Sequence, residues 1–374
     1  MWRQPIGAGW SGFAVVGDYA VTQEQRSNKE LTVCYEIETG KVAWRHIDRV
    51  RWDPTGPGAL GGIGPRATPA VYEGRVYVHG PTGIVNCLDA QTGDVLWSHD
   101  TLDEFDARNV MWGKSCSPVI VGDMVVVSVG GAKDQSLVAF DQQSGDVVWT
   151  VGNRRSSYAT PALMTLGDTR QIVCVNEASI TAHDAATGRV LWEHPWRNKS
   201  DSSAAASQPV QVGDHRIWLS MGYGRGAELI EVVNVDDRWE VKRVWKRPVL
   251  KTKMTNIVVR DGYAYGISDG RIFECVEIKS GRPVWRQRRT PSFGHGQILL
   301  VGDAILILCE SGEMVMIAAS PEGYEELGAF HALEGVTWNN PALSGSKLLV
   351  RNAQEAACYE LPTAESAVDA IREL

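Results

Sequence analysis

The stretch LDAQTGDVLW at residues 88–97 decides the fold, because its pattern is repeated along the chain. An Asp, a Thr-Gly pair and a Trp follow one another at fixed spacing, with the Trp four residues after the Gly. The same Gly-to-Trp spacing returns in the stretches that end at Trp44, Trp149, Trp192 and Trp285. This recurrence across 374 residues predicts a repeat architecture instead of two unrelated domains.

Three degenerate copies complete the series. Trp245 lacks the Thr-Gly pair, Phe330 stands where a Trp is expected, and Trp2 stands alone at the start. The eight positions lie 40 to 53 residues apart, a length that fits four short strands per unit. We therefore expect an all-β fold, an eight-bladed β-propeller of four-stranded blades. Its structural docking residues would be Trp2, Trp44, Trp97, Trp149, Trp192, Trp245, Trp285 and Phe330.

The two ends of the chain predict how the ring closes. The last unit, residues 340–361, supplies three strands but no Trp, whereas the chain opens with an orphan Trp-bearing strand at residues 1–4. We expect residues 1–4 to complete the last blade and close the ring. Residues 1–362 would then form a single propeller domain, and residues 363–374 a short C-terminal helix or tail.

The repeated pattern resembles the tryptophan-docking motif of pyrroloquinoline-quinone (PQQ) repeats. Such repeats build the eight-bladed propellers of quinoprotein alcohol dehydrogenases and of BamB-like outer-membrane assembly lipoproteins. The resemblance implies a bacterial protein of the periplasm or cell envelope, and it leaves the function open because enzymes and scaffolds share the repeat. The N-terminus, Met1 to Gln4, lacks the basic and apolar regions of an export signal.

Composition excludes several classes of protein. The chain carries 37 Lys and Arg against 45 Asp and Glu, a net charge of −8, which argues against a globally basic nucleic-acid binder. No apolar run is long enough to predict a transmembrane segment. The seven cysteines include no Cys-x-x-Cys pair, so their spacing excludes a zinc site. Six of them occupy equivalent strand positions in different units and read as packing residues, and Cys116 alone lies where a ligand could meet it. We expect a monomer.

Chemistry in a propeller is expected around its central channel. Aligning the eight units on their turn signals places two rings of residues at the start of the inner strands. The first ring is Trp10, Arg66, Ser115, Tyr158, Ala206, Lys253, His295 and Trp338. The second ring, two residues further on and therefore on the same strand face, is Gly12, Thr68, Ser117, Thr160, Gln208, Thr255, Gln297 and Asn340.

Neither ring contains an Asp or a Glu. The resemblance implies that a PQQ dehydrogenase needs oxygen ligands for Ca²⁺, a carboxylate base and commonly an adjacent pair of cysteines. The sequence supplies no Cys-Cys pair and no carboxylate in either ring. We therefore assign no catalytic residue and no metal ligand, and we expect no cofactor; PQQ with Ca²⁺ belongs only to the alternative of a dehydrogenase.

Charge is distributed unevenly over the repeats. The segments from each docking position to the next inner strand carry 18 Lys and Arg against 9 Asp and Glu. With the loops between the second and third strands added, this end of the channel, the mouth face, has a net charge of about +5 and the rest of the chain about −13. Such asymmetry favours an anionic partner at the mouth, although Lys and Arg on blade edges can also serve to prevent aggregation.

These observations lead to one principal function and two alternatives. The principal one is a non-catalytic binding or scaffold module that takes a protein partner or a small anionic ligand on the mouth face. Its ligand-binding residues would be Trp10, Arg66, Tyr158, Lys253, His295, Trp338, Gln208 and Asn340. One alternative is a PQQ-dependent or other oxidoreductase with its site at the mouth, and the other is an enzyme of different chemistry that uses Arg66, Lys253, His295 and Tyr158.

Overall fold

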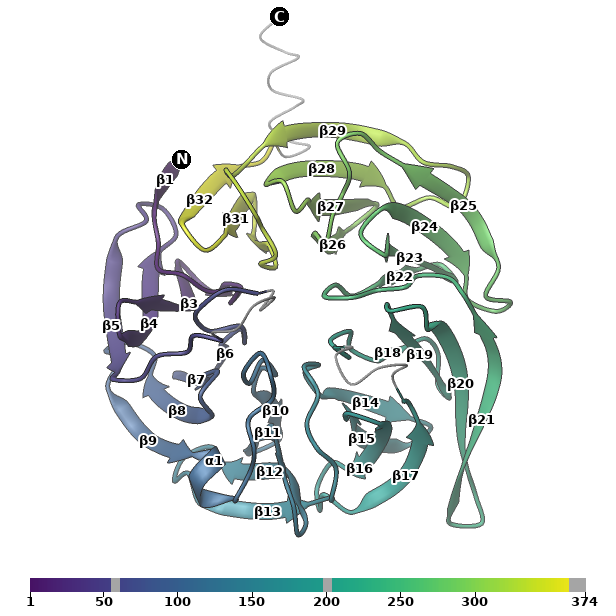
Figure 1. The fold of residues 1–374 in the computed structure, drawn as a ribbon, viewed down its shortest axis with the longest axis horizontal. Coiled ribbons are helices and arrows are strands. Elements are labelled where there is room, and N and C mark those ends of the chain that lie inside the picture. Colours follow the sequence, from purple (N-terminus) through teal and green to yellow (C-terminus); the bar gives the residue numbers. More distant parts are fainter. Residues whose placement is uncertain (55–60, 198–203, 363–374) are drawn as a thin grey trace, which may run out of the picture.

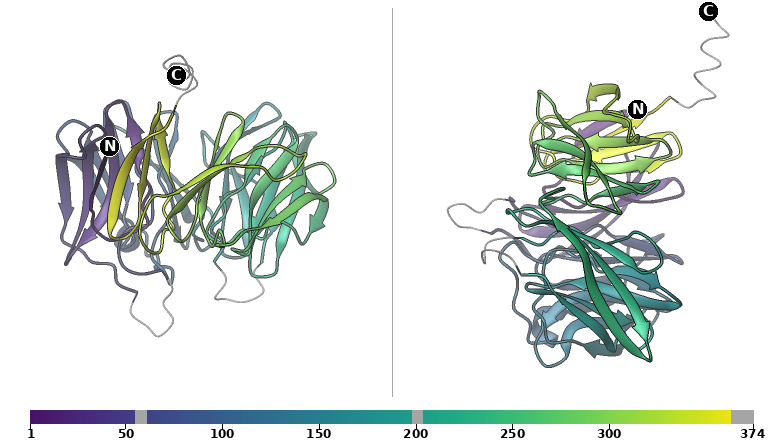
Figure 2. Two further views of the ribbon diagram at one scale, coloured as in Figure 1. Left: turned by 90° about the horizontal axis from the view of Figure 1, so that it is seen from above. Right: turned by 90° about the vertical axis from the view of Figure 1, so that its right-hand side faces the viewer.

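A computed structural model describes residues 1–54, 61–197 and 204–362. Over these residues the chain forms eight four-stranded antiparallel sheets arranged as blades around a central axis (Figure 1). Seen from the side, the blades make a disc whose strands are inclined to one another (Figure 2). The predicted eight-bladed β-propeller is confirmed. The expected C-terminal helix or tail, residues 363–374, lies outside the described residues.

Each blade runs outward from its inner strand. Blades 1 to 4 contain β2 (Ala14–Val16), β3 (Tyr19–Arg26), β4 (Lys29–Glu36) and β5 (Val42–Asp48); β6 (Ala70–Tyr72), β7 (Arg75–His79), β8 (Ile84–Asp89) and β9 (Val95–Asp100); β10 (Val119–Val121), β11 (Met124–Gly131), β12 (Gln135–Asp141) and β13 (Val147–Val151); and β14 (Ala162–Leu166), β15 (Thr169–Val175), β16 (Ser179–Asp184) and β17 (Val190–Pro195). A short helix, α1 (Thr101–Glu104), follows β9.

The second half of the ring repeats this order. Blades 5 to 8 contain β18 (Val210–Gln211), β19 (Arg216–Met221), β20 (Gly226–Val235) and β21 (Arg238–Arg247); β22 (Val258–Arg260), β23 (Tyr263–Ser268), β24 (Ile272–Glu277) and β25 (Pro283–Arg288); β26 (Gln297–Val301), β27 (Ala304–Leu308), β28 (Glu313–Ala318) and β29 (Glu326–His331); and β30 (Ala342–Ser344), β31 (Lys347–Arg351) and β32 (Glu355–Glu360) with β1 (Trp2–Pro5).

The ring closes as the sequence predicts. Strand β1 pairs with β32 in antiparallel register from Trp2 opposite Cys358 to Pro5 opposite Glu355. Figure 1 shows the N-terminal strand beside β32 at the junction of the first and last blades. The Arg3 guanidinium holds the Glu355 carboxylate with two hydrogen bonds of 2.7 and 2.6 Å. The first and last segments of the chain thus share one sheet.

The repeated pattern joins each blade to the next. Asp89 folds the turn between β8 and β9, the corner of blade 2, because its Oδ1 accepts hydrogen bonds from the backbone N–H groups of Gln91 and Thr92 at 2.8 and 2.9 Å. The indole of Trp44 in blade 1 lies on this corner and donates to Ala90 O at 2.9 Å. A Cβ on Gly93, whose φ is +77°, would come within 2.4 Å of the Trp44 ring. Only glycine allows both this backbone conformation and this contact.

The junction of blades 4 and 5 departs from the pattern. Blade 5 has no Thr-Gly corner; β20 and β21 form a hairpin of two ten-residue strands that runs past its neighbours (Figure 1). Its turn, Asp236 and Asp237, has positive φ at both residues, as a tight two-residue turn requires. Trp239 of the hairpin packs against the core cluster that contains Trp192. Trp192 Nε1 finds its partner within its own blade, at Gln171 Oε1 (2.8 Å).

The cores lie between blades and are built from facing apolar strand positions. One cluster, for example, joins Tyr77 and Val85 of blade 2 to Val125 and Phe140 of blade 3. All seven cysteines are free and buried, Cys116 included. Among the described residues, no helix has the length and apolar character needed to cross a membrane.

Candidate functional site

Both rings lie in the segments that enter the blades at the mouth. The expectation that these positions open the inner strands is wrong for every member except Gln297; Thr68, Thr160 and Asn340, for example, each precede their strand by two residues. The inner strands are short, three to five residues in most blades. Ladder pairing therefore begins only after the ring positions, whose backbone groups find partners in the neighbouring blade.

The second ring forms a hydrogen-bonded belt around part of the channel. Gly12 N donates to Thr68 Oγ1 (3.1 Å), Thr68 N to Ser117 Oγ (3.0 Å), and Ser117 N to Thr160 Oγ1 (2.9 Å). In each case the donor belongs to one blade and the acceptor to the next. The hydroxyl groups at these positions therefore satisfy backbone donors and hold adjacent blades together.

The two amides predicted to bind ligand lie at this level too. Gln208 Nε2 donates to Thr160 O at 3.3 Å, and its backbone N–H donates to Asn256 Oδ1 at 2.8 Å. Gln208 therefore takes part in the same joining of blades. Asn340 is exposed and lies next to Gly12, where a Cβ would come within 3.5 Å of Asn340 Cβ.

The first ring supplies an aromatic pair where blades 1 and 8 meet. The rings of Trp10 and Trp338 have centroids 4.8 Å apart and planes inclined at 40°. Trp338 Nε1 donates to Glu310 Oε1 at 3.0 Å, and Trp10 Nε1 donates to the carbonyl of Gly61. Both indoles are half-buried, so each shows one side to the mouth and is fixed by its N–H.

Arg66 is held by its own loop. Its guanidinium donates to Gly64 O at 2.6 Å, Gly61 O at 3.0 Å and Gly62 O at 2.8 Å. Burial lowers the pKa of Arg66 to about 10, although the nearby Tyr158 hydroxyl opposes this effect. The side chain shares Gly61 O with Trp10, so it positions the segment 61–64 beside the indole.

Tyr158 and Lys253 extend the mouth across blades 4 to 6. The Tyr158 ring lies 5.3 Å from that of Trp112, and burial raises the pKa of its hydroxyl, with a smaller contribution from Tyr223. Lys253 Nζ lies over the Tyr223 ring, 5.5 Å from its centroid. This is a cation–π distance. A Cβ on Gly222 would come within 2.4 Å of Lys253 Cγ, so the glycine leaves room for the lysine stem.

His295 lies in the segment that leads into blade 7, two residues before β26. Burial lowers its pKa, the Lys253 charge lowers it further, and the carboxylates of Glu310 and Asp269 oppose both effects. The imidazole is therefore close enough to the Lys253 ammonium and to the Glu310 carboxylate for both charges to affect its ionisation. Since Glu310 also holds Trp338, electrostatic and direct contacts link the six chemically distinctive residues of the first ring into one band around the mouth: Trp10, Arg66, Tyr158, Lys253, His295 and Trp338. Ser115 and Ala206 are the small members of this ring.

Glu310 is the site residue that the ring alignment misses. It lies between β27 and β28, and it reaches the mouth because Gly294 has no side chain: a Cβ there would come within 2.3 Å of Glu310 Cβ. Glu310 Oε2 accepts from His295 N at 2.9 Å, and Glu310 O accepts from Thr337 N at 2.9 Å. The sequence around it, Cys-Glu-Ser-Gly, is that of an ordinary hairpin turn and does not single out Glu310. The one relevant feature of the sequence is the glycine at Gly294, next to His295, which leaves room for the Glu310 side chain.

The donor groups at the mouth do not fit PQQ with Ca²⁺. Calcium takes six to eight oxygen ligands, with carboxylates among them. The hydroxyls of Thr68, Ser117 and Thr160 already accept backbone hydrogen bonds, and each side-chain oxygen of Glu310 accepts one hydrogen bond from the protein. Within the described parts of the chain, no three His, Cys, Asp or Glu side chains are grouped to hold a metal ion.

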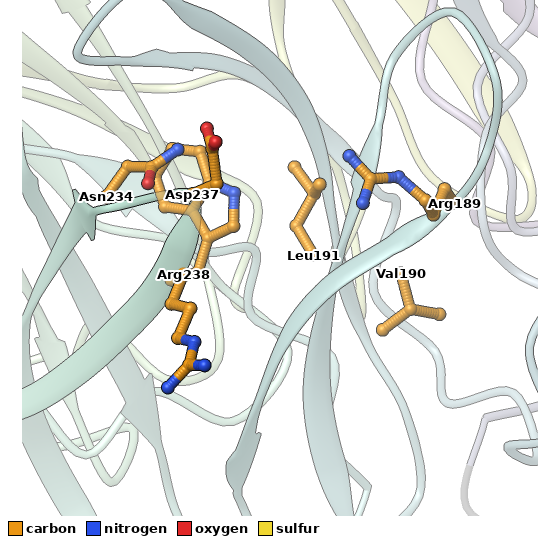
Figure 3. Close-up of a pocket in the computed structure, with 7 residues that line it drawn as sticks. Arg189, Val190, Leu191, Asn234, Asp237 and Arg238 are labelled. Atoms are coloured by element: carbon orange, nitrogen blue, oxygen red, sulfur yellow. The ribbon is translucent and has the colours of Figure 1, made fainter.

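Two cavities lie away from the mouth. One of about 500 Å³ separates the start of β17 from the tip of the β20–β21 hairpin (Figure 3). Its lining is Arg189, Val190, Leu191, Asn234, Asp237, Arg238 and Trp239. The other, about 590 Å³, lies at the seam between blades 8 and 1, beside Tyr19 and Lys347. Neither is lined by a residue of either ring.

Blades joined by indoles that lie on Thr-Gly corners define the chain as a tryptophan-docked eight-bladed propeller. Comparison with known families agrees with this class. The chain belongs to the family described as PQQ_2, outer membrane protein assembly factor BamB, whose model matches residues 1–101 and 28–287.

Individual relatives fall into two functional groups. The outer membrane protein assembly factor BamB of Bordetella pertussis is 24% identical over 318 residues, 82% of this chain and 72% of that protein. The quinohemoprotein alcohol dehydrogenase ADH-IIG of Pseudomonas putida is 29% identical over 256 residues, 61% of this chain. The match covers 33% of the dehydrogenase, so this chain corresponds to about a third of that protein.

Two of the matching solved structures come from the same two groups. BamB from Moraxella catarrhalis superposes with a TM-score of 0.65 at 15% identity, over 96% of this chain and 99% of that one. A europium-containing methanol dehydrogenase superposes with a TM-score of 0.67 at 13% identity, over 93% and 84%. At such identities the superpositions show a common fold and leave the function to the site.

Proposed function

We propose that the protein is a non-catalytic binding module whose mouth face takes an anionic ligand or the acidic surface of a protein partner. The band of first-ring residues carries this proposal. This band contains the aromatic faces of Trp10 and Trp338 together with the Lys253 ammonium and the His295 imidazole. Stacking together with charge-assisted hydrogen bonds suits a planar or carboxylated anion.

The contacts within the protein divide the predicted ligand-binding residues into two groups. Arg66 and Gln208 donate to carbonyl groups of the protein, so we assign them the positioning of the mouth. Lys253 Nζ has its cation–π contact with Tyr223 and donates no hydrogen bond to another described residue, and Asn340 is exposed. We assign direct contact with the ligand to Lys253, His295, Tyr158, Asn340 and the two indoles.

The setting of the protein follows from its relatives. Those named as outer membrane protein assembly factors span most of this chain, and we propose that this protein likewise works in the bacterial cell envelope with a protein partner. A mildly basic mouth on an otherwise acidic molecule would orient such a partner before contact.

A second candidate is a PQQ-dependent oxidoreductase. The similarity to dehydrogenases over 61% of the chain favours it, whereas the donor groups at the mouth oppose it. Dye-linked alcohol oxidation in the presence of PQQ and Ca²⁺ separates the two candidates.

The binding function is tested with a planar dianion, naphthalene-2,6-dicarboxylate, by equilibrium dialysis. We expect saturable binding that weakens about tenfold in Lys253→Met, which keeps the stem and removes the charge. Lys279→Met, at an exposed lysine in the corner between β24 and β25, is the matched control and should bind as the unaltered protein does. Absence of binding, or equal affinity in Lys253→Met, would contradict the proposal.

A further inference from the structure

One buried carboxylate near the mouth is surrounded by more positive charge than it can neutralise. Glu228, at the start of β20, is 1% exposed. Its oxygens lie 3.3 Å from Arg225 Nη2, 3.2 Å from Lys246 Nζ, 3.2 Å from His194 Nε2 and 4.0 Å from Arg243 Nη1. We call these five residues the Glu228 cluster. Among the described residues, three permanent cations and a histidine thus share the single negative charge of Glu228.

The surplus charge is visible in the properties of the cluster. Burial raises the pKa of Glu228, but hydrogen bonds from His194 and Lys246 and the nearby positive charges outweigh it, so the net pKa is lowered. Burial lowers the pKa of Arg225, and the charge of Arg243 lowers it further. Arg225 stacks on Trp196 at 3.8 Å, and its buried Nε has no hydrogen-bond partner within residues 1–54, 61–197 and 204–362.

The positive charge continues along the outer strand of the blade. Arg238, Lys242, Arg243, Lys246 and Arg247 are all exposed on β21, whose only acidic residue is Glu240. On the next blade β25 adds the exposed Arg286 and Arg288. β21 is hydrogen-bonded to β20 alone and is the outermost strand of its sheet. In a chain of net charge −8, this is a local concentration of cations on an open strand edge.

Protection against aggregation does not account for this pattern. Charged side chains do blunt open strand edges, but the outer strands β9, β13, β17 and β29 are equally open and contain no Lys or Arg. The outer strands β5 and β1 carry one arginine each, Arg45 and Arg3. Several cations on one outer strand are therefore found only on β21 of blade 5 and β25 of blade 6 among the described blades.

We propose that the Glu228 cluster and the adjoining length of β21 dock an acidic, extended segment of a protein partner. The inference rests on the proposed binding function and names where on the mouth face the partner lies. A strand rises about 3.3 Å per residue, so Arg243 and Arg247 are separated by roughly 13 Å of strand. That span exceeds a small anion, and the half-exposed Lys246 and Arg243 enclose no cradle for one. A row of Asp or Glu side chains matches both the spacing and the charge.

The test uses a fluorescein-labelled decaglutamate peptide, titrated with the protein and followed by fluorescence anisotropy at low salt. We expect binding that weakens about tenfold in the Arg243→Gln, Lys246→Gln double variant, since exposed charges of this kind act mainly through complementarity. Arg154→Gln, Arg155→Gln removes two exposed mouth-face cations from another blade and is the matched control. Arg247→Gln, outside the Glu228 cluster, provides an independent variant that leaves the buried carboxylate fully partnered.

Each outcome decides the matter. Loss of affinity in the double variant and in Arg247→Gln, with the control unchanged, supports the docking site. Equal loss in the control, or none in the double variant, overturns it, as does displacement of the peptide by inorganic phosphate beyond the effect of chloride at equal ionic strength. Failure of the proposed function would appear separately, as turnover with PQQ and Ca²⁺ in the absence of any peptide.

Discussion

The indole nitrogen of Trp2 donates to the carbonyl of Ile37 at 2.7 Å. Trp2 belongs by its backbone to blade 8, where it faces Cys358, and by its side chain it lies on the corner of blade 1, against Gly40. One N-terminal strand thus closes the ring twice, through its backbone and through its side chain. The contact repeats at the chain's own seam what Trp44 and Ala90 do between blades 1 and 2.

Deleting residues 1–4 should therefore destabilise the whole propeller. It removes the outer strand of blade 8, uncovers the edge of β32 and withdraws the half-buried Trp2 indole from the corner of blade 1. We expect the lost strand pairing and the lost indole together to cost about 3 kcal/mol or more. Thermal melting should show a clear drop. Deleting residues 363–374 is the comparison, and equal small effects of the two deletions would mean that β1 does not close the ring.

Gly93→Ala should destabilise the protein through its contact with Trp44. The substitution adds strain at φ +77° and a collision at 2.4 Å with the indole. Gly74→Ala in the same blade is the matched control, because its φ is +73° and nothing lies within 4 Å of the added Cβ. In chemical denaturation we expect the free energy of unfolding to fall by about 1 kcal/mol for the control and by about 3 kcal/mol for Gly93→Ala. Equal losses of stability in the two variants would show that the Trp44 ring moves to accommodate the added methyl group at no energetic cost.

Arg351→Met should weaken the seam between blades 8 and 1. The Arg351 side chain is fully buried, and it donates to Thr22 Oγ1 at 2.6 Å, Gln23 O at 2.9 Å and Gly7 O at 2.9 Å. Removing the donor leaves these acceptors unpaired, at a cost of about 3 kcal/mol. The exposed Arg282→Met should melt as the unaltered protein does. An unchanged melting temperature for Arg351→Met would mean that the seam does not depend on this side chain.

Glu30 should make stability fall as pH rises. Burial raises its pKa from the ordinary 4.5 to about 8, and the charge of Asp48 adds to the shift. The folded protein then holds this proton more tightly than the unfolded chain does, so its contribution to stability is full below pH 4.5 and is lost as pH rises to about 8. Glu30→Gln should match the unaltered protein at pH 5 and exceed it by roughly 2 kcal/mol or more at pH 8.5. Urea denaturation at both pH values, with the exposed Glu73→Gln as control, checks this; a constant difference between the two pH values would contradict it.

Repetition is what made the fold predictable. A motif that recurs with Trp44, Trp97 and Trp149 fixes blade number and strand order without any knowledge of long-range contacts, and the orphan Trp2 reveals the closure. The long β20–β21 hairpin could not be predicted in this way. The degenerate sequence of blade 5 shows only that the Thr-Gly corner between its third and fourth strands is absent. The length of the hairpin depends on packing of Trp239 against blade 4, a contact between elements that the sequence does not place side by side.

The site was predictable in part for the same reason. Alignment on turn signals selects mouth positions such as Trp10 and Trp338, since equivalent repeat positions share a location. Side chains that reach the mouth from other loops do not occupy the aligned repeat positions. The alignment therefore does not identify Glu310 and Tyr223. Nor does the alignment show that the Arg66 guanidinium is directed to the carbonyls of residues 61–64, because such a contact depends on the local path of the backbone.

The most direct test of the central claim, that the mouth binds without catalysing, is dye reduction by the protein mixed with PQQ, Ca²⁺ and a primary alcohol. We predict no Ca²⁺-dependent change in the absorbance of PQQ and no dye reduction above a protein-free mixture, because the hydroxyls and the carboxylate at the mouth are already bonded within the protein. Saturable, alcohol-dependent dye reduction that rises with protein concentration would contradict the claim and make the protein a quinoprotein dehydrogenase.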